Sequence, residues 1–356
     1  METYLGLDLG GTKLLIGEMD SRGNILRYKK YDSGYFNQQA ALEIIKSSLD
    51  DYIRTVGWYD QKPVAMGVGL IGRVDPNEGV WLQIDPSRTQ RIELAKELSD
   101  IYGMPCHIDN DVKSATRAER VWGFGQISKN FIYVNVGTGI AVGTVINGRQ
   151  IRGSHFNAGE VGHVRVGVNI GIKCGCGRMD CVEAIAAGIG FDNCARLLRN
   201  QYETGLHIPA EKGERVIVSE VFALSQKGDP LCTVLVENAA EALANLIMNL
   251  VRVIDPDTVV LGGGIVADGY MHEKILEKLH PTTMRFVSNG VVITKLNPGF
   301  IGLLGAGAVA HPLEVLDAVD VEHRGDVGHD ELSQLAVAGR EAWHQAVAVQ
   351  GQVFFF

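Results

Sequence analysis

The chain has 356 residues, which is long enough for two domains at about 100–200 residues each. Apolar residues make up 46% and charged residues 21%, a balance typical of soluble globular proteins. The net charge of −9 disfavours a surface for nucleic acids or anionic membranes. We expect neither a signal peptide, since no basic segment precedes an apolar one, nor a membrane span. The six cysteines are too few for a disulfide scaffold, so we expect a cytoplasmic protein with reduced thiols.

The N-terminal part reads as an α/β series. Residues 4–18 are apolar, then glycine-rich, then apolar, which predicts two strands joined by a tight turn at Gly10–Gly11. A turn at 21–24 and a short third strand follow. The spacing of apolar residues then predicts helices at 38–56, 92–102 and 112–121, and strands at 64–70 and 104–108.

A second series repeats this order from residue 130. A strand at 131–136, a glycine turn at 137–139 and a return strand at 140–146 match the N-terminal pattern and suggest a duplicated architecture. Further on we expect helices at 231–253 and 302–310 and strands at 258–261 and 291–294. The tail from His311 has no lysine and holds four of the ten histidines; we assign it no function.

Three glycine-rich turns are candidate nucleotide sites. In Asp8-Leu-Gly10-Gly11-Thr12-Lys13, glycines let backbone N–H groups approach phosphate oxygens, and Asp8 can hold Mg²⁺ through water. Gly137-Thr138-Gly139 repeats this arrangement, and Gly262-Gly263-Gly264 leaves room for an adenine or a ribose. A structural hairpin, or a tight turn from strand to helix, explains each glycine turn equally well.

Two polar segments are candidates for acceptor chemistry. Asn110-Asp111 lies where a strand passes into a helix, so it is either an N-cap or the site of a general base for phosphoryl transfer. Glu160, in a glycine-flanked turn, is either an acceptor for sugar hydroxyls or a solvated loop acid.

A cysteine cluster has the spacing of a metal site. Cys174, Cys176 and Cys181 lie close together after His163, and a Cys3His set is a closed structural zinc arrangement. Free thiols in a surface loop are the alternative. The remaining cysteines (Cys106, Cys194 and Cys232) stand singly in apolar contexts and are expected in the core.

Together these features resemble the ROK family, the bacterial-type sugar kinases and related repressors of the actin-like ATPase superfamily. The matching motifs span about residues 3–310: DLGGTK (8–13), IDNDV (108–112), VGTG (136–139), NAGEVGH (157–163), CGCGRMDCVE (174–183), VVLGGG (259–264) and GLLGAGAVA (302–310). The resemblance implies two α/β domains of the actin-like ATPase (ribonuclease H-like) fold around a central cleft. They are residues 1–117, completed by about 300–312, and residues 118–299, which carry the zinc loop; residues 313–356 are a tail of unknown structure.

The resemblance also implies roles for particular residues. Asp111 is expected to be the catalytic base, and Asn110, Glu160, His163 and Glu183 to bind the sugar. His163 would bind zinc with its other ring nitrogen. Mg·ATP would lie between the turns at 8–13 and 137–139, the acceptor would be a hexose or hexose derivative, with its 6-OH as the attacking hydroxyl, and a homodimer is the expected assembly.

The chain departs from the family pattern near the expected sugar cleft. Residues 70–75 replace a Pro-Gly-Pro segment, residues 82–88 replace an Asn-Leu-x-Gly-Trp segment, and Asp180 replaces a glycine in the zinc loop. Lys113 replaces a small polar residue, and with Arg73 and Arg88 it suggests an acidic or amino sugar unless all three face solvent.

Two alternatives to a kinase remain open in the sequence. A sugar-responsive ROK regulator would need a helix-turn-helix, for which the first strand at about Tyr4 leaves no room. A non-catalytic sugar-binding protein fits the altered cleft, although Asp8, Asp111 and Glu160 are all present.

Overall fold

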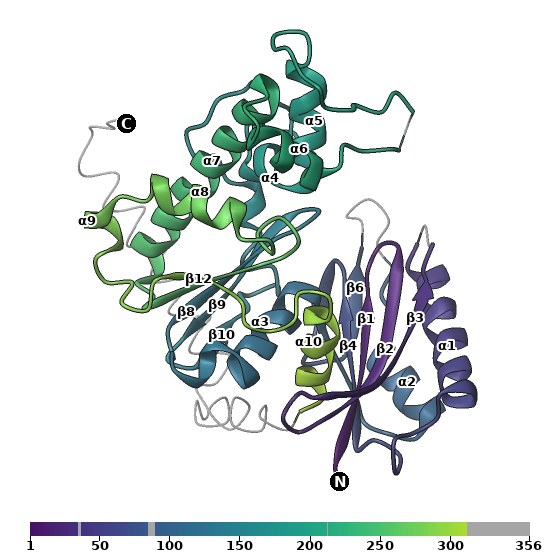
Figure 1. The fold of residues 1–356 in the computed structure, drawn as a ribbon. Coiled ribbons are helices and arrows are strands. Elements are labelled where there is room, and N and C mark those ends of the chain that lie inside the picture. The colour runs from purple at the N-terminus through teal and green to yellow at the C-terminus, as the bar shows by residue number, and fades with distance from the viewer. Residues whose placement is uncertain (35–36, 85–89, 212, 312–356) are drawn as a thin grey trace, which may run out of the picture. The chain divides into compact units, whose positions relative to one another are not determined.

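The computed structural model describes residues 1–34, 37–84, 90–211 and 213–311 (Figure 1). Contacts group Met1–His311 into one compact unit, and the predicted tail of residues 313–356 lies outside the described residues. The predicted domain boundaries within this unit therefore stay a prediction.

The first sheet has the order β3-β2-β1-β4-β7. Its strands are β1 (Thr3–Leu9), β2 (Lys13–Asp20), β3 (Ile25–Asp32), β4 (Ala65–Leu70) and β7 (Cys106–Asn110). The first three strands pair antiparallel, and β1, β4 and β7 run parallel. A small hairpin, β5 (Arg73–Asp75) with β6 (Val80–Gln83), follows β4.

The second sheet repeats this topology strand for strand, with the order β10-β9-β8-β11-β12. Its strands are β8 (Phe131–Val136), β9 (Ile140–Ile146), β10 (Arg149–Ile151), β11 (Thr258–Gly262) and β12 (Val291–Ile293). Again three strands (β8, β9 and β10) form an antiparallel meander. β8 also pairs in parallel with β11, which pairs in parallel with β12. The predicted duplication of the architecture is confirmed.

Some helices begin or end at residues that local chemistry favours. Asn37 caps α1 by accepting the N–H of Ala40, and Asp229 caps α7 ahead of Pro230. Gly103, with a φ of 60°, ends α2. The helices are α1 (Gln38–Thr55), α2 (Leu94–Tyr102), α3 (Asp111–Trp122), α4 (Val182–Ala186), α5 (Gly188–Leu198), α6 (Val218–Ser225), α7 (Pro230–Ile254), α8 (Tyr270–Lys278), α9 (Pro281–Met284) and α10 (Ile301–Ala310), with 3₁₀ turns η1 (Phe124–Gln126) and η2 (Val161–His163).

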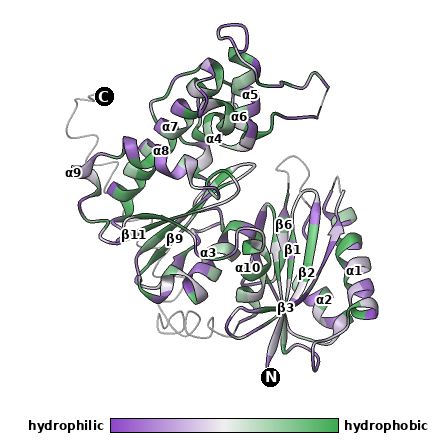
Figure 2. Cartoon of the chain, in the orientation of Figure 1, coloured by the Kyte–Doolittle hydropathy of each residue, from purple (hydrophilic) through white to green (hydrophobic). Residues whose placement is uncertain are grey.

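Helix α10 packs against β1 and β4 of the first sheet and against α3, although it follows the second sheet in the chain (Figure 1). In Figure 2 the residues of α10 are coloured neutral to hydrophobic, and eight of its ten residues are buried. Gly67 of β4 permits the close approach, since a Cβ there would collide with the carbonyl of Ala306. The last helix of the described chain is therefore packed against its first strand.

One described helix, α7, is long and apolar enough to cross a membrane. In its most apolar window 61% of the residues are buried within the protein, as in a core helix. Its buried side chains, among them Leu235, Leu243 and Ile247, belong to the largest apolar cluster. Packing in the protein core therefore explains why α7 is both long and apolar.

Candidate active site and metal-binding loop

The duplicated topology brings two equivalent strand ends to one cavity. Asp8 and Asn135 are each the penultimate residue of their strands, β1 and β8. Both line a cavity of about 160 Å³, together with Lys13, Asp111 and the segment 298–302 that leads into α10. Of the predicted site residues, this cavity brings together Asp8, Lys13 and Asp111.

Asn135 was not among the predicted site residues. The signal for it was present, since it is a polar residue inside the apolar run Phe131–Val136, just before the glycine turn. Pro298 and Gly299 also line the cavity, and their sequence context gave no comparable signal.

Two carboxylates in the cavity have raised pKa values. Burial raises the pKa of Asp8 to about 6, and the charge of Lys13 opposes the shift. Burial also raises the pKa of Asp111 to about 6; the negative charges of Asp8 and Glu160 add to the increase, and a hydrogen bond from the Val112 N–H opposes it. A carboxylate of this pKa is ionised at neutral pH yet basic enough to accept a proton from a hydroxyl.

Asn110 is the N-cap of α3, as one of the two interpretations predicted. Its Oδ1 accepts the N–H groups of Val112 (3.0 Å) and Lys113 (3.2 Å). Its Nδ2 donates to the carbonyl of Gly72 at 3.0 Å. Capping fixes the first turn of α3 and therefore the place of Asp111 at that turn.

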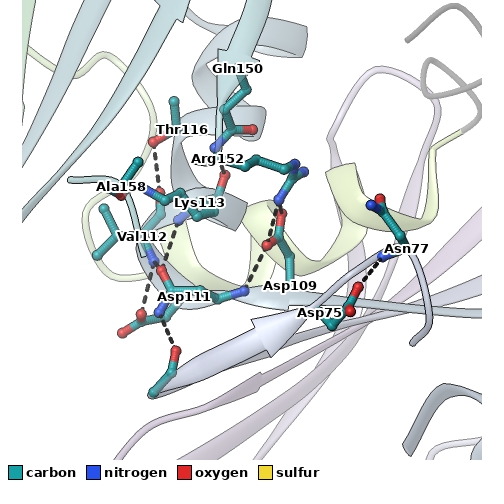
Figure 3. Close-up of polar contacts among 12 residues, drawn as sticks. Asp75, Asn77, Asp109, Asp111, Val112, Lys113, Thr116, Gln150, Arg152 and Ala158 are labelled. Atoms are coloured by element: carbon teal, nitrogen blue, oxygen red, sulfur yellow. Dashed lines mark hydrogen bonds and ion pairs between the residues drawn. The ribbon is translucent and has the colours of Figure 1, made fainter. Parts of the chain in front are cut away.

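Lys113 does not face solvent, so that expectation was wrong, and its predicted place beside the sugar pocket stays a prediction. Only 6% of Lys113 is exposed, and its Nζ donates to the carbonyls of Val142 and Ala158 (Figure 3). Its direction follows from its place on the buried side of α3. Arg73 lies half-buried on β5, and Arg88 lies outside the described residues.

The glycine turns are closed by backbone hydrogen bonds. The N–H of Gly10 donates to the carbonyl of Lys13 at 2.9 Å, and that of Gly137 to Gly139 at 3.0 Å. Gly11 has open space where a side chain would lie, as a phosphate-binding turn requires. Thr12 and Thr138, both exposed, lie in these two turns.

Packing explains two of the three glycines at the end of β11. A Cβ at Gly262 would collide with the hydroxyl of Tyr133, and one at Gly263, whose φ is 92°, with the carbonyl of Val136. Gly264 faces open space. The structural explanation therefore holds for Gly262 and Gly263, and room for a ligand remains at Gly264.

Glu183 connects the second glycine turn to the loop that carries Glu160. Its Oε2 accepts the N–H of Ile140 at 3.0 Å, just after Gly139. A Cβ at Gly162 would lie 3.0 Å from the same oxygen. Glu160 itself is exposed.

The donor atoms of the cysteine cluster converge. One ligand atom each from His163, Cys174 and Cys176 lies within 4.8 Å of the others. The Sγ of Cys174 is 3.4 Å from Nδ1 of His163, and the Sγ atoms of Cys176 and Cys181 are 3.7 Å apart. A tetrahedral zinc site has S···N and S···S edges of about 3.6 and 3.8 Å, given Zn–N and Zn–S bonds of about 2.05 and 2.3 Å. These two distances are compatible with zinc, which Nδ1 of His163 would bind, leaving Nε2 for another partner; the converging group itself comprises His163, Cys174 and Cys176.

Asp180 supports the loop in place of the expected glycine. Its φ is 56°, which aspartate tolerates better than most residues. Its Oδ1 accepts the N–H groups of Ile170 (3.1 Å), Gly171 (2.8 Å) and Ile172 (2.9 Å). The substitution therefore keeps the backbone conformation and adds three hydrogen bonds.

Restoring the glycine, Asp180→Gly, is expected to lower the free energy of unfolding by about 1–3 kcal/mol, because three backbone N–H groups, that of Ile172 buried, lose an acceptor. Denaturant unfolding measures the loss. Asp180→Asn is the control, since it keeps the oxygen and tolerates the positive φ; equal stability of Asp180→Gly and the parent protein would contradict this account.

Known proteins resemble the chain along most of its length. The model of the ROK family matches residues 4–312. The chain belongs to the ROK family. A ROK hexokinase of known structure from Thermus thermophilus is 31% identical, with 88% of this chain and 99% of that chain covered and a TM-score of 0.68.

Curated relatives extend this likeness to sugar kinases. A glucokinase of Thermotoga maritima is 26% identical, covering 86% of this chain and 96% of its own length. An N-acetyl-D-glucosamine kinase of Salmonella newport is 27% identical, covering 86% of this chain and 99% of its own length. The predicted family and actin-like ATPase fold are confirmed, and so is the predicted enzyme class, an ATP-dependent carbohydrate kinase.

Proposed function

We propose that this ROK protein transfers the γ-phosphate of ATP to the 6-OH of a hexose or hexose derivative, with Asp111 as the general base. The observation that carries the proposal is the cavity in which Asp111 lies with Asp8, Lys13 and Asn135. The names of the relatives, hexokinase, glucokinase and N-acetyl-D-glucosamine kinase, support the choice of acceptor.

The phosphate side of the site fits Mg·ATP. Asp8 offers a carboxylate for hydrated Mg²⁺, Lys13 offers a cation for phosphate oxygens, and Asn135 adds an amide. Gly11 and Gly264 leave open backbone at two of the turns. Mg²⁺ supplies charge neutralisation for the phosphates when bound.

The acceptor side would be formed by Asn110, Glu160, His163 and Glu183. The Asp111 carboxylate takes the proton of the attacking hydroxyl as the oxygen approaches the γ-phosphorus. Phosphoryl transfer needs little more than this positioning and charge stabilisation, so the protein's main task is to hold both substrates in line.

We propose that His163, Cys174, Cys176 and Cys181 hold a structural zinc ion. The edges measured between their donor atoms support this assignment. A metal on Nδ1 would fix the imidazole plane, so that Nε2 of His163 meets a sugar hydroxyl in a defined direction.

The raised pKa of Asp111 predicts an acid limb in the activity profile. Only the carboxylate can accept the proton, so kcat/KM for the sugar, which reports ionisation of the free enzyme, is expected to rise tenfold per pH unit below about 6 and to level off above it. Protonation of Asp8, whose pKa is also about 6, acts in the same direction. Steady-state kinetics from pH 5 to 8 measures this; a kcat/KM that is constant down to pH 5 would contradict the assigned base.

A cytoplasmic location and a homodimer are further parts of the proposal, and they follow from the family resemblance. Sedimentation equilibrium of the purified protein tests the dimer.

A further inference from the structure

We propose that Lys113 and Asp109 are positioning residues that hold the acceptor loop, defined as residues 152–163, in place beside Asp111. The inference rests on the proposed kinase function, because it assigns an acceptor-binding role to Glu160 and His163 in this loop. It starts from residues 109–113. Asp109, just before Asn110, and Lys113, two residues after Asp111, both bind the same loop.

Lys113 binds the second half of the loop. Its buried ammonium group donates to the carbonyl of Val142 on β9 at 2.9 Å and to the carbonyl of Ala158, two residues before Glu160. In the other direction, the amide of Gln150 donates to the carbonyl of Lys113 at 2.9 Å. Figure 3 shows Lys113 directed from α3 towards Ala158.

Asp109 binds the beginning of the loop. Only 2% of this residue is exposed, and both carboxylate oxygens accept from Nη1 of Arg152, at 2.8 and 2.7 Å (Figure 3). Charge-assisted hydrogen bonds of this kind, withdrawn from water, are strong and directional. The loop is thus held at its first residue and again at Ala158.

The loop backbone just after Ala158 lies directly on β9. The N–H of Val142 donates to the carbonyl of Gly159 at 2.9 Å. Gly159 has a φ of 97°, and a Cβ there would collide with the Val142 carbonyl and lie 2.8 Å from the Lys113 nitrogen. Glu160 therefore follows a backbone that touches both β9 and Lys113, and a shift at Lys113 moves Glu160 relative to Asp111.

The charge of Lys113 also suits its surroundings. Burial lowers its pKa, and the carboxylates of Asp109, Glu160 and Asp111 oppose that shift, while Arg152 adds to it. A cation at this point offsets repulsion among carboxylates that the site brings together. A neutral side chain of similar length cannot do this.

The test is Lys113→Met, which keeps the volume but neither the charge nor the donor. We expect the KM for the sugar to rise about ten- to hundredfold, since a displacement of about 1 Å can cost that much, while the KM for ATP changes by less than about twofold. Hydrogen–deuterium exchange at residues 153–163 is expected to increase in the same variant.

The matched control is Arg117→Met. Arg117 is a buried, positively charged residue on the same helix. Its Nη2 donates to the backbone carbonyl of His311 at 2.8 Å, away from the acceptor loop. The Arg117→Met variant is expected to be less stable than the parent protein, without a change in the sugar KM or in hydrogen–deuterium exchange at residues 153–163. Asp109→Asn is a second test variant, which weakens the bond to Arg152 and should reproduce both effects if Lys113→Met fails to fold.

A double mutant separates positioning from general destabilisation. In a Glu160→Gln background, Lys113→Met should raise the sugar KM much less than in the parent, because both changes act on one contact. Additive effects, or a lower kcat with unchanged sugar KM and unchanged loop exchange, would overturn the inference. A parent protein that is inactive on every sugar overturns the proposed function, and loop exchange alone then decides the positioning role.

Discussion

Replacing Asp111 by asparagine is expected to lower kcat by about 10²–10⁴-fold, the range that a general base contributes. Asparagine can still accept the Val112 N–H, which Asp111 Oδ1 accepts at 2.9 Å, so the first turn of α3 should keep its geometry. Binding of the sugar and of ATP is expected to change little. Single-turnover kinetics with saturating substrates measures the loss in the chemical step.

The same variant is expected to be more stable than the parent protein at pH 7. The native state holds the pKa of Asp111 at about 6, above its ordinary value of 3.8, so the folded form binds the proton more tightly. The stability that this group contributes is complete below pH 4 and is lost as the pH rises through 6. Asparagine removes this loss, by up to about 3 kcal/mol. Retained turnover in a folded Asp111→Asn protein would exclude Asp111 as the base.

Loss of one cysteine of the metal cluster is the second large expected effect. In Cys174→Ser, bound zinc should fall from about one ion per chain to near zero, because a thiolate is replaced by a poor ligand. The sugar KM is expected to rise about tenfold or more, since His163 loses the metal that fixes its ring, while the KM for ATP stays near its parent value.

Cys194→Ser is the matched control for this experiment. Cys194 is buried and its thiol lies 3.5 Å from the carbonyl of Ala184, outside the cluster. Metal analysis by mass spectrometry and kinetics with both substrates compare the two variants. Full zinc content in Cys174→Ser, or an absence of zinc in the parent protein, would contradict the Cys3His assignment.

The sequence predicted the framework because its signals are local. Alternating apolar runs around glycine turns specify the two hairpins β1–β2 and β8–β9, and α1 and α7 follow from helical spacing with good caps. The duplication was visible for the same reason. The short helices α4, α5 and α6 and the hairpin β5–β6 were not predicted, because each is stabilised by packing that no local pattern records.

For the candidate site, too, the residues in local motifs were predicted and those that depend on long-range contacts were not. The convergence of Asp8, Lys13 and Asp111 followed from motifs at strand ends. The burial of Lys113 was not predicted, because only the fold reveals the two carbonyls that it binds. The Asp109–Arg152 pair was missed because its members are 43 positions apart in the chain.

The central claim is sugar-dependent phosphoryl transfer from ATP, and its most direct test is ADP release from Mg·ATP with a panel of neutral, amino, N-acetylated and acidic sugars. We expect at least one hexose or hexose derivative to give stoichiometric ADP and sugar 6-phosphate, and Asp111→Asn to give neither. Folded, zinc-bearing protein that releases no ADP with any sugar of the panel would contradict the account.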